Sequence, residues 1–378
     1  MKNIFKFKVI FVLIFTLSFH AQICEKNITD FLQKVINESG SPGLSASVAI
    51  NGKIVYSGGV GYAELENLGP SSGNSVHNIA SISKMHAVIA LMQLWEQGKL
   101  DLDAEIQKYV PYFPKKKYPI TVKNILTHTS GIRHYKKGEF GKQDIYQKMH
   151  YETLKEGIAI FKDDPLIFKP GKYWSYSSYA FNLTQGIIEN ITGVSFESYL
   201  RKYVWEPAGL INTQFDVPNR IVNKRGKGYR KNKNGIVQNI DYVDVSYKYA
   251  GGGILSTTDD LVKLAIALNN GTLLKPETLR KMYEVQLFNV EIFNSGNPKP
   301  MKHKQALGWF IRTDAQGRDF LCHTGSVKGT KSVLINYPQH DICVALIGNI
   351  SSFHPMEYGT AIAQMFLPPI NSRYQIEN

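Results

Sequence analysis

A long, almost uniformly apolar segment follows Ser81 and Lys84 in the sequence. Its residues recur at helical spacing on one side and are small or apolar on the other: Met85, Val88, Ile89, Met92 and Trp95, against Ala87, Ala90, Leu91 and Leu94. A helix that is apolar on nearly all faces belongs in a protein core. Gly98 then stands where the C-terminal cap of such a helix is expected. The pattern predicts a buried helix from about Met85 to Gly98.

Strand-like patterns lie near the N-terminus and in the final third of the chain. A helical pattern over Asn27–Glu38 is followed by two strand-like runs, Leu44–Ile50 and Lys53–Ser57, which the hairpin signal Asn51-Gly52 joins. The final third contains four further predicted strands: Leu307–Arg312, Asp319–Cys322, Lys331–Tyr337 and Ile342–Gly348.

The middle of the chain, from Asp101 to about Thr213, shows mostly helical patterns and long loops. Two of its segments are predicted helices, Phe181–Asn190 and Ser195–Val204. No internal repeat or low-complexity tract interrupts this arrangement.

The first 21 residues resemble an export signal. Three lysines give it a positive start: Lys2, Lys6 and Lys8. The apolar run Val9–Ser18 is too short to span a bilayer as a mature helix, and Ala21 is a small residue suited to cleavage. A short N-terminal membrane anchor is the alternative, and the residues before Cys24 match a lipoprotein signal poorly. We expect a secreted or periplasmic protein that begins near Gln22.

The chain has 378 residues, 43% of them hydrophobic, which is enough for one large or two medium domains. Its three cysteines, Cys24, Cys322 and Cys343, form neither a disulfide framework nor a metal-binding spacing. Cys322 and Cys343 lie in apolar runs and are expected to be small core residues, with a bridge between them as the alternative.

The formal net charge is +13, which favours contact with anionic polymers or membrane faces. The densest basic run, Lys224–Lys233, ends in the turn signal Asn234-Gly235 and predicts a solvated hairpin. Nucleic-acid binding would need more than one such loop. The basic surface therefore indicates at most a loose association with the cell envelope.

Ser81 and Lys84 stand three residues apart, a spacing that puts both side chains on one face of a helix. A serine hydroxyl needs an adjacent base to become a nucleophile, and a lysine is such a base only when burial or a neighbouring charge lowers its pKa. The motif S-x-x-K is common by itself, and a capping serine followed by a solvated lysine is the alternative. The apolar helix that follows supplies burial and favours the catalytic interpretation.

Two further polar segments carry candidate chemistry. Tyr176 stands in the run Pro170–Ser178, where a phenol near an ammonium group can hold or pass on a proton. His323 begins the run His323–Ser326 at the end of a predicted strand, where a polar side chain and the glycine Gly325 can line a substrate groove. Taken singly, each has an ordinary alternative: a half-buried tyrosine, and a strand-end turn.

Together, the S-x-x-K, Tyr-Ser-x and His-Thr-Gly segments resemble, in this order, the serine β-lactamase and penicillin-binding protein superfamily. The resemblance covers the chain from about Phe31 to Asn349 and is closest to the class C β-lactamase and D,D-peptidase branch. Within that branch the chain is most similar to the mitochondrial serine β-lactamase-like proteins of animals. Four runs carry this closer match: Ile79–Lys84, His128–Tyr135, Pro165–Gly171 and Tyr247–Thr257.

The resemblance implies an α+β fold of the β-lactamase type, following the signal at residues 1–21. A domain over residues 22–378 would combine an α/β part, about 25–75 and 255–370, with a mostly helical part, about 80–250. The α/β part would contain an antiparallel sheet with flanking helices. The active site would lie in the cleft between the two parts.

The resemblance also implies a role for each candidate residue. Ser81 would be acylated by an amide or ester carbonyl, and Lys84 and Tyr176 would form the proton-handling pair. Backbone N–H groups of Ser81 and Ser326 would form an oxyanion hole. The other candidates would bind the substrate: Ser178, His323, Thr324 and Gly325. His323 takes a position that lysine holds in many members, and no metal or organic cofactor is implied.

Two features depart from the family pattern. The second motif often ends in Asn, whereas here it ends in Ser178, whose hydroxyl is shorter and offers one donor instead of two. This departure bears on β-lactam recognition more than on acylation. The animal proteins carry a longer charged stretch between the segments that match Tyr135 and Pro165, so their filament formation is not carried over.

Three functional hypotheses follow. The leading one is a secreted serine hydrolase that cleaves peptide or related amide bonds. The second is an esterase or β-lactamase with the same nucleophile, and the third is a non-catalytic, filament-forming scaffold, against which the intact set Ser81, Lys84 and Tyr176 speaks. A small-molecule or peptide substrate is the expected partner, nucleic acid is not expected, and the oligomeric state is open.

Overall fold

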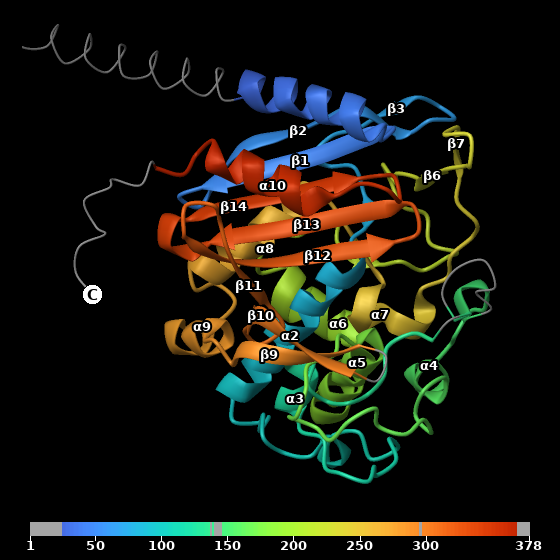
Figure 1. Ribbon diagram of the computed structural model, residues 1–378, viewed down its shortest axis with the longest axis vertical. Coiled ribbons are helices and arrows are strands. Elements are labelled where there is room, and N and C mark those ends of the chain that lie inside the picture. The colour runs from blue at the N-terminus through green and yellow to red at the C-terminus, as the bar shows by residue number, and fades with distance from the viewer. Residues whose placement is uncertain (1–24, 137, 140–145, 295–296, 369–378) are drawn as a thin grey trace, which may run out of the picture.

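A nine-stranded antiparallel sheet organises the computed structural model, which describes residues 25–136, 138–139, 146–294 and 297–368. The strand order is β3-β2-β1-β14-β13-β12-β11-β10-β9. The strands span Gly43–Ile50 (β1), Lys53–Glu64 (β2), Gly69–Pro70 (β3), Leu287–Asn294 (β9), Asn297–Gln305 (β10), Phe310–Thr313 (β11), Asp319–Val327 (β12), Thr330–Tyr337 (β13) and Ile342–Gly348 (β14). Because β1 pairs with both β2 and β14, the two ends of the chain build one sheet (Figure 1).

Helices and short helical turns dominate the chain between β3 and β9. They are η1 (Ala80–Ile82), α2 (Ser83–Glu96), η2 (Ile106–Lys108), α3 (Val122–Leu126), η3 (Tyr146–Lys148), α4 (Leu154–Ala159), α5 (Ser178–Thr192), α6 (Phe196–Leu200), η4 (Arg201–Trp205), η5 (Ser246–Lys248), α7 (Tyr249–Gly252), α8 (Thr258–Asn269) and α9 (Pro276–Tyr283), with η6 (Pro338–His340) and α10 (Pro355–Gln364) after β13 and β14. The fold is α+β, as predicted.

Two small sheets complete the fold. The first has the order β4-β8-β5, from His77–Asn78, Ile254–Ser256 and Gln214–Phe215. The second pairs β6 (Tyr229–Lys231) with β7 (Val237–Asn239), and Gly235 makes the turn between them with a φ of 79°. This second sheet is the basic hairpin that the sequence predicts.

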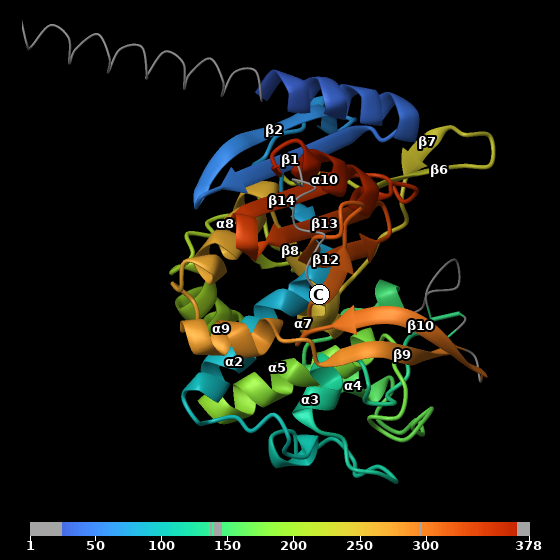
Figure 2. The same cartoon turned by 60° about the vertical axis from the view of Figure 1, so that its left-hand side comes forward.

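The large sheet is apolar on both faces because its side chains alternate. Val344 and Leu346 of β14 point to one face, and Ala345 and Ile347 point to the other. The helix at residues 25–39 and α10 cover the first face, and α8 packs on the second (Figures 1 and 2). Most of the other helices lie on that second side, where the turn η1 also contacts β12 and β13 directly.

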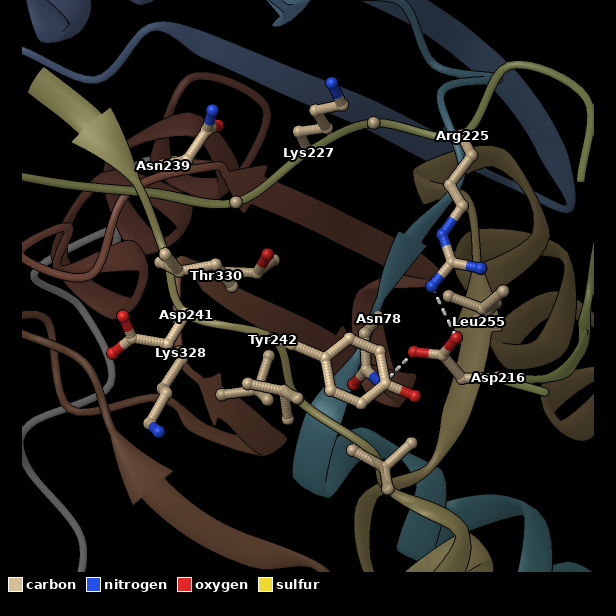
Figure 3. Close-up of a pocket in the computed structure, with 16 residues that line it drawn as sticks. Asn78, Asp216, Arg225, Lys227, Asn239, Asp241, Tyr242, Leu255, Lys328 and Thr330 are labelled. Carbon is tan, nitrogen blue, oxygen red and sulfur yellow. Dashed lines mark hydrogen bonds and ion pairs between the residues drawn. The ribbon is translucent and has the colours of Figure 1, made fainter. Parts of the chain in front are cut away.

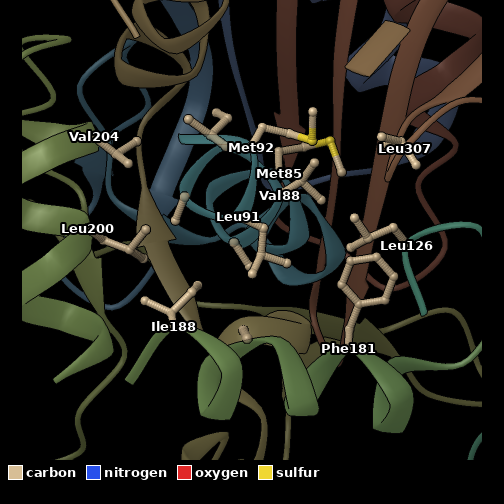
Figure 4. Close-up of a cluster of buried hydrophobic side chains, with 14 of the residues drawn as sticks. Met85, Val88, Leu91, Met92, Leu126, Phe181, Ile188, Leu200, Val204 and Leu307 are labelled. Carbon is tan, nitrogen blue, oxygen red and sulfur yellow. The ribbon is translucent and has the colours of Figure 1, made fainter. Parts of the chain in front are cut away.

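The predicted central helix is α2, which begins at Ser83 and ends at Glu96, and Gly98 follows it with a φ of 69°. Figure 4 shows how its side chains, among them Met85 and Leu91, lie among apolar residues of the neighbouring elements. Ser81 stands just before α2, in the turn η1. Packing on all sides therefore fixes the end of the helix that carries Ser81 and Lys84.

The two described cysteines, Cys322 and Cys343, are free and buried, as expected for core residues. Cys322 packs with Val333 and Ile335 on one face of the large sheet, and Cys343 packs with the core on the other face. The sheet thus separates the two thiols and rules out the alternative of a bridge. Cys24 and the predicted export signal lie outside the described residues.

The C-terminal strand predictions need two corrections. The predicted strand Asp319–Cys322 continues to Val327, because β12 keeps pairing with β13 along its whole length. His323–Ser326 therefore belongs to a strand and is not a strand-end turn. The hairpin of β9 and β10 was not predicted at all.

The β9–β10 hairpin is hidden in the sequence by Pro298 and Pro300, which usually exclude a strand interior. Here both prolines lie where β10 pairs only with β9, and an edge position tolerates proline. The other side of β9 joins the backbone of Trp174: its N–H donates to the Glu291 carbonyl at 3.0 Å, and its carbonyl accepts from the Phe293 N–H at 2.9 Å. Figure 2 shows the hairpin lying beside the helical region.

Candidate active site

Ser81 and Lys84 meet at the start of α2, as their spacing predicts. The Lys84 ammonium nitrogen Nζ lies 3.2 Å from Ser81 Oγ. The lysine side chain is completely buried, whereas Ser81 is half-buried and lines a cavity. The nucleophile candidate is thus accessible, and its neighbouring amine is shielded from solvent.

Three oxygens surround Lys84 Nζ. Besides Ser81 Oγ, they are Ser178 Oγ at 3.1 Å and the Gly251 carbonyl oxygen at 2.5 Å. An ammonium group donates to all three. A neutral amine donates to two of them and keeps one lone pair, which can accept the hydroxyl proton of Ser81. The contact geometry therefore accommodates the neutral amine, which can act as a base, as well as the ammonium group.

Burial, and then the nearby positive charge of Lys248, hold the pKa of Lys84 well below its ordinary value of 10.5. Both causes disfavour the charged form. The buried side chain thus supplies the depressed pKa that the catalytic interpretation of S-x-x-K requires.

Tyr176 joins Ser81 and Lys84 in the same cluster. It lines the cavity together with Ser81 and Ser178, and Lys84 Nζ lies 5.0 Å from its ring centre. Burial raises the pKa of Tyr176 to about 12. The phenol therefore stays protonated near neutral pH. It can relay a proton, but it is not present as a phenolate that could act as a general base.

Ser178, a predicted substrate contact, lies between the cavity and Lys84. It is the first residue of α5, its hydroxyl contacts Lys84, and its backbone N–H donates to Nδ1 of His134 at 3.2 Å. The residue lines the cavity, but it is almost completely buried. Its hydroxyl thus belongs to the same cluster as Ser81 and Lys84.

The segment His323–Ser326 runs along β12 beside the turn η1. Residues 319–322 of β12 pair with β11, while residues 323–327 pair with β13 alone among the described strands. A Cβ atom on Gly325 would lie 2.1 Å from the Ile79 carbonyl oxygen, so only glycine permits this close approach of β12 to the segment before Ser81. The free edge of β12 therefore stands next to the candidate nucleophile.

The four candidates on β12 have different surroundings. Ser326 lines the cavity with Ser81, whereas His323 and Thr324 do not. His323 is buried against Phe310, and its Nδ1–H donates to the Thr324 carbonyl at 2.7 Å. Burial, followed by the charge of Lys84, lowers the pKa of His323 to about 3. The imidazole is neutral at pH 7 and does not supply the positive charge of a lysine.

The cavity has a volume of about 460 Å³ and contains residues that the sequence interpretation left without a role. They are Ala80, His134, Tyr135, Lys136, Lys248, Gly251 and Gly252. The ammonium of Lys248 lies 5.5 Å from the ring centre of Tyr135 and 5.1 Å from that of Tyr247. Several of these residues fall in runs that carry the family resemblance, which is the one sequence signal that pointed to them.

The described residues contain neither a metal-binding cluster nor a membrane-spanning helix. No group of three or more His, Cys, Asp or Glu side chains lies close enough together there to hold a metal ion. In the same part of the chain, every helix is too short or too polar to cross a membrane.

Comparisons with known proteins agree with the geometry. The family model named Beta-lactamase matches residues 25–364. The human protein "Serine beta-lactamase-like protein LACTB, mitochondrial" is 31% identical over 396 residues, which cover 82% of this chain and 71% of that protein. The octameric penicillin-binding protein homologue from Pyrococcus abyssi has a TM-score of 0.77 and 28% identity, covering 90% of this chain and 77% of that one. A D-stereospecific amidohydrolase from Streptomyces has a TM-score of 0.74 at 23% identity, covering 89% of this chain and 97% of that one.

Proposed function

The chain belongs to the beta-lactamase family, and from this premise we propose that it is a secreted serine hydrolase that cleaves peptide or related amide bonds through an acyl-enzyme on Ser81. The observation that carries the proposal is the buried Lys84 amine, 3.2 Å from the Ser81 hydroxyl in an accessible cavity. A serine next to a lysine of depressed pKa is an activated nucleophile.

Acylation follows from these positions. Lys84 Nζ accepts the proton of Ser81, and Ser81 Oγ forms a bond to the substrate carbonyl carbon. The backbone N–H groups of Ser81 and Ser326 stabilise the oxyanion, a contribution of about 3 kcal/mol for one such donor. The C–N bond then breaks, and the proton held by Lys84 passes through the Tyr176 hydroxyl to the leaving amine. Water then attacks the carbonyl carbon of the acyl-enzyme ester. Its proton passes through Tyr176 to Lys84 and on to Ser81 Oγ as the C–O bond breaks and the acid is released.

The open edge of β12 supports a peptide-like substrate. On the β11 side, no described strand pairs with residues 323–327, so an extended peptide can pair there and present a carbonyl carbon to Ser81. Backbone pairing of this kind needs amide groups on both sides of the reacting bond. A simple ester gains nothing from it, which is why we place amide hydrolysis first.

The first test is a substrate panel for the purified protein: a short peptide amide, a p-nitrophenyl ester and the lactam nitrocefin. We expect the largest kcat/KM with a peptide-type substrate whose length is sufficient to lie along β12. Preference for the ester or the lactam would favour the alternative role of esterase or β-lactamase. Absence of turnover on all three would favour the non-catalytic scaffold.

A second test concerns Ser178. An asparagine at this position would reach further into the cavity and could donate to the amide carbonyl beside the scissile bond, a contact worth about 1–3 kcal/mol in a desolvated site. We expect Ser178→Asn to raise the kcat/KM for nitrocefin relative to that for the p-nitrophenyl ester by about ten- to hundredfold. The ester provides the internal control for the loss of the Lys84 contact. An unchanged ratio would mean that Ser178 does not discriminate between these substrates.

Export is the remaining part of the proposal. It is supported by the lysine-rich start and the short apolar run of residues 1–21. We expect N-terminal sequencing of protein from the culture medium or periplasm to begin near Gln22. An intact Met1 terminus on cytosolic protein would contradict export. The net charge of +13 further supports loose binding to an anionic cell envelope.

A further inference from the structure

The residue immediately before the proposed nucleophile has an unusual backbone conformation. Ala80 has a φ of 49°, in the left-handed region that residues with a Cβ atom rarely adopt. The residue is buried. Its conformation turns the chain from β4 into η1 and so determines the direction in which the Ser81 side chain points. Such a conformation persists only when neighbouring groups hold it in place.

Asn78 is the group that holds Ala80. The backbone N–H of Ala80 donates to the side-chain oxygen of Asn78 at 2.7 Å. The neighbouring residue Ile79 is fixed separately, because its N–H donates to the Ile254 carbonyl and its carbonyl accepts from the Ser332 hydroxyl. The Asn78 amide thus binds the one residue of this segment that is under strain.

The orientation of the Asn78 amide is itself fixed. Its nitrogen donates to Asp216 Oδ2 at 2.9 Å, and Arg225 donates to Asp216 Oδ1 at 2.6 Å (Figure 3). A carboxylate only accepts hydrogen bonds, so the amide nitrogen must face Asp216 and the amide oxygen must face Ala80. These three side chains form a continuous chain of contacts along one wall of a second cavity.

The small sheet β4-β8-β5 brings these residues together. β8 pairs with β4, which ends at Asn78, and with β5, which directly precedes Asp216. The Asp216 N–H also donates to the Gly253 carbonyl, in the turn whose Gly251 carbonyl accepts from Lys84. The carbonyl groups of residues 251–254 therefore hold both the chain that precedes Ser81 and the Lys84 amine beside it.

We propose that Asn78, oriented by Asp216 and Arg225, is a positioning residue that keeps Ala80 in the left-handed conformation and so aims Ser81 Oγ at the substrate carbonyl. This inference rests on the proposed acyl-enzyme function. Asn78 does not touch the reacting atoms. Its effect is on the geometry of the serine, and misplacement of a reacting atom by about 1 Å can cost about a hundredfold in rate.

The test is a set of variants assayed on the p-nitrophenyl ester. Asn78→Ala should lower kcat by about ten- to hundredfold with little change in KM, because the substrate still binds but Ser81 Oγ is no longer oriented toward its carbonyl carbon. Ala80→Gly in the Asn78→Ala background should restore most of the lost kcat, since glycine adopts a positive φ without a steric penalty. Asn78→Ser, which keeps a short acceptor for the Ala80 N–H, should fall between wild type and Asn78→Ala.

Asn239→Ala is the matched control. Asn239 lines the same cavity, but it is exposed and its amide donates to Glu66. This variant should keep the wild-type kcat. Wild-type kcat in Asn78→Ala, or a loss that Ala80→Gly does not restore, would overturn the inference.

Unfolding free energies of the same variants separate this inference from the proposed function. Ala80→Gly should stabilise the wild type, in which Asn78 holds Ala80 under strain, more than it stabilises the Asn78→Ala protein, in which Ala80 has already relaxed, whether or not the ester is hydrolysed. Equal effects in the two backgrounds would overturn the positioning role. A wild-type protein that neither hydrolyses the ester nor reacts with a fluorophosphonate, yet shows this coupling, would refute the function alone. If Asn78→Ala does not fold, the comparison is made with Asn78→Ser.

Discussion

Ser81→Ala is expected to remove all covalent labelling by a fluorophosphonate probe. Hydrolysis should fall to a residual rate about 10³-fold above the uncatalysed reaction, which the oxyanion hole and substrate binding still supply. The wild-type protein should take up one label per chain. The reason is geometric: Ser81 and Ser178 both line the cavity and contact the buried Lys84 amine, but Ser178 is almost completely buried, whereas Ser81 is half-buried and open to the probe.

Mass spectrometry of the labelled peptide measures this result directly. Heat-unfolded wild type is the control, because it contains every serine of the chain but no organised site. Labelling that persists in folded Ser81→Ala would transfer the nucleophile to another residue and would contradict the proposed mechanism.

Lys84→Met is expected to lower kcat/KM by about 10²–10⁴, the usual range for a positioned acid–base group. Methionine keeps the length and apolar character of the side chain but has no lone pair for the Ser81 proton. A lysine buried with a depressed pKa costs folding free energy wherever the unfolded chain would be protonated, that is, below an unfolded pKa of about 10.4. At pH 7 the Met variant should therefore be at least as stable as the wild type, while its activity falls.

The pH profile distinguishes a base from a merely structural lysine. The wild-type rate should rise with pH through the depressed pKa of Lys84 and then level off, because only the neutral amine accepts a proton. Lys248→Met is the matched control: it removes a neighbouring positive charge, so this rise should move to higher pH. A Lys84→Met enzyme with wild-type activity would assign the base role to Tyr176.

The sequence predicted the catalytic candidates better than it predicted their surroundings. Ser81 and Lys84 share a local motif, and an apolar helix follows them, so their contact could be expected from spacing alone. Tyr176 required the family resemblance, because no local pattern links it to a helix almost a hundred residues away. The contact of Ser178 with Lys84 could not be predicted, since it depends on how α5 packs against α2.

The same distinction holds for the fold. Strands with continuous apolar runs, such as β13 and β14, were found from composition. The β9–β10 hairpin was missed, because its prolines and lysines are compatible with a strand only at the edge of a sheet. Asn78 gave no signal either: its importance depends on the positive φ of Ala80 and on Asp216, both of which follow from tertiary structure.

The pairing of β9 with Trp174 also bears on how the edge of the large sheet is covered. An edge strand with free N–H and carbonyl groups is a template on which a second chain can add a strand. Here the Glu291 carbonyl and the Phe293 N–H are already bonded to Trp174 of the same chain. Lateral growth of the sheet at this place would have to displace the loop that carries Tyr176. The segment that positions the Tyr176 side chain thus also blocks edge-to-edge association at β9. A substitution that loosens this segment would expose an aggregation-prone edge and would also displace Tyr176 from the candidate active site.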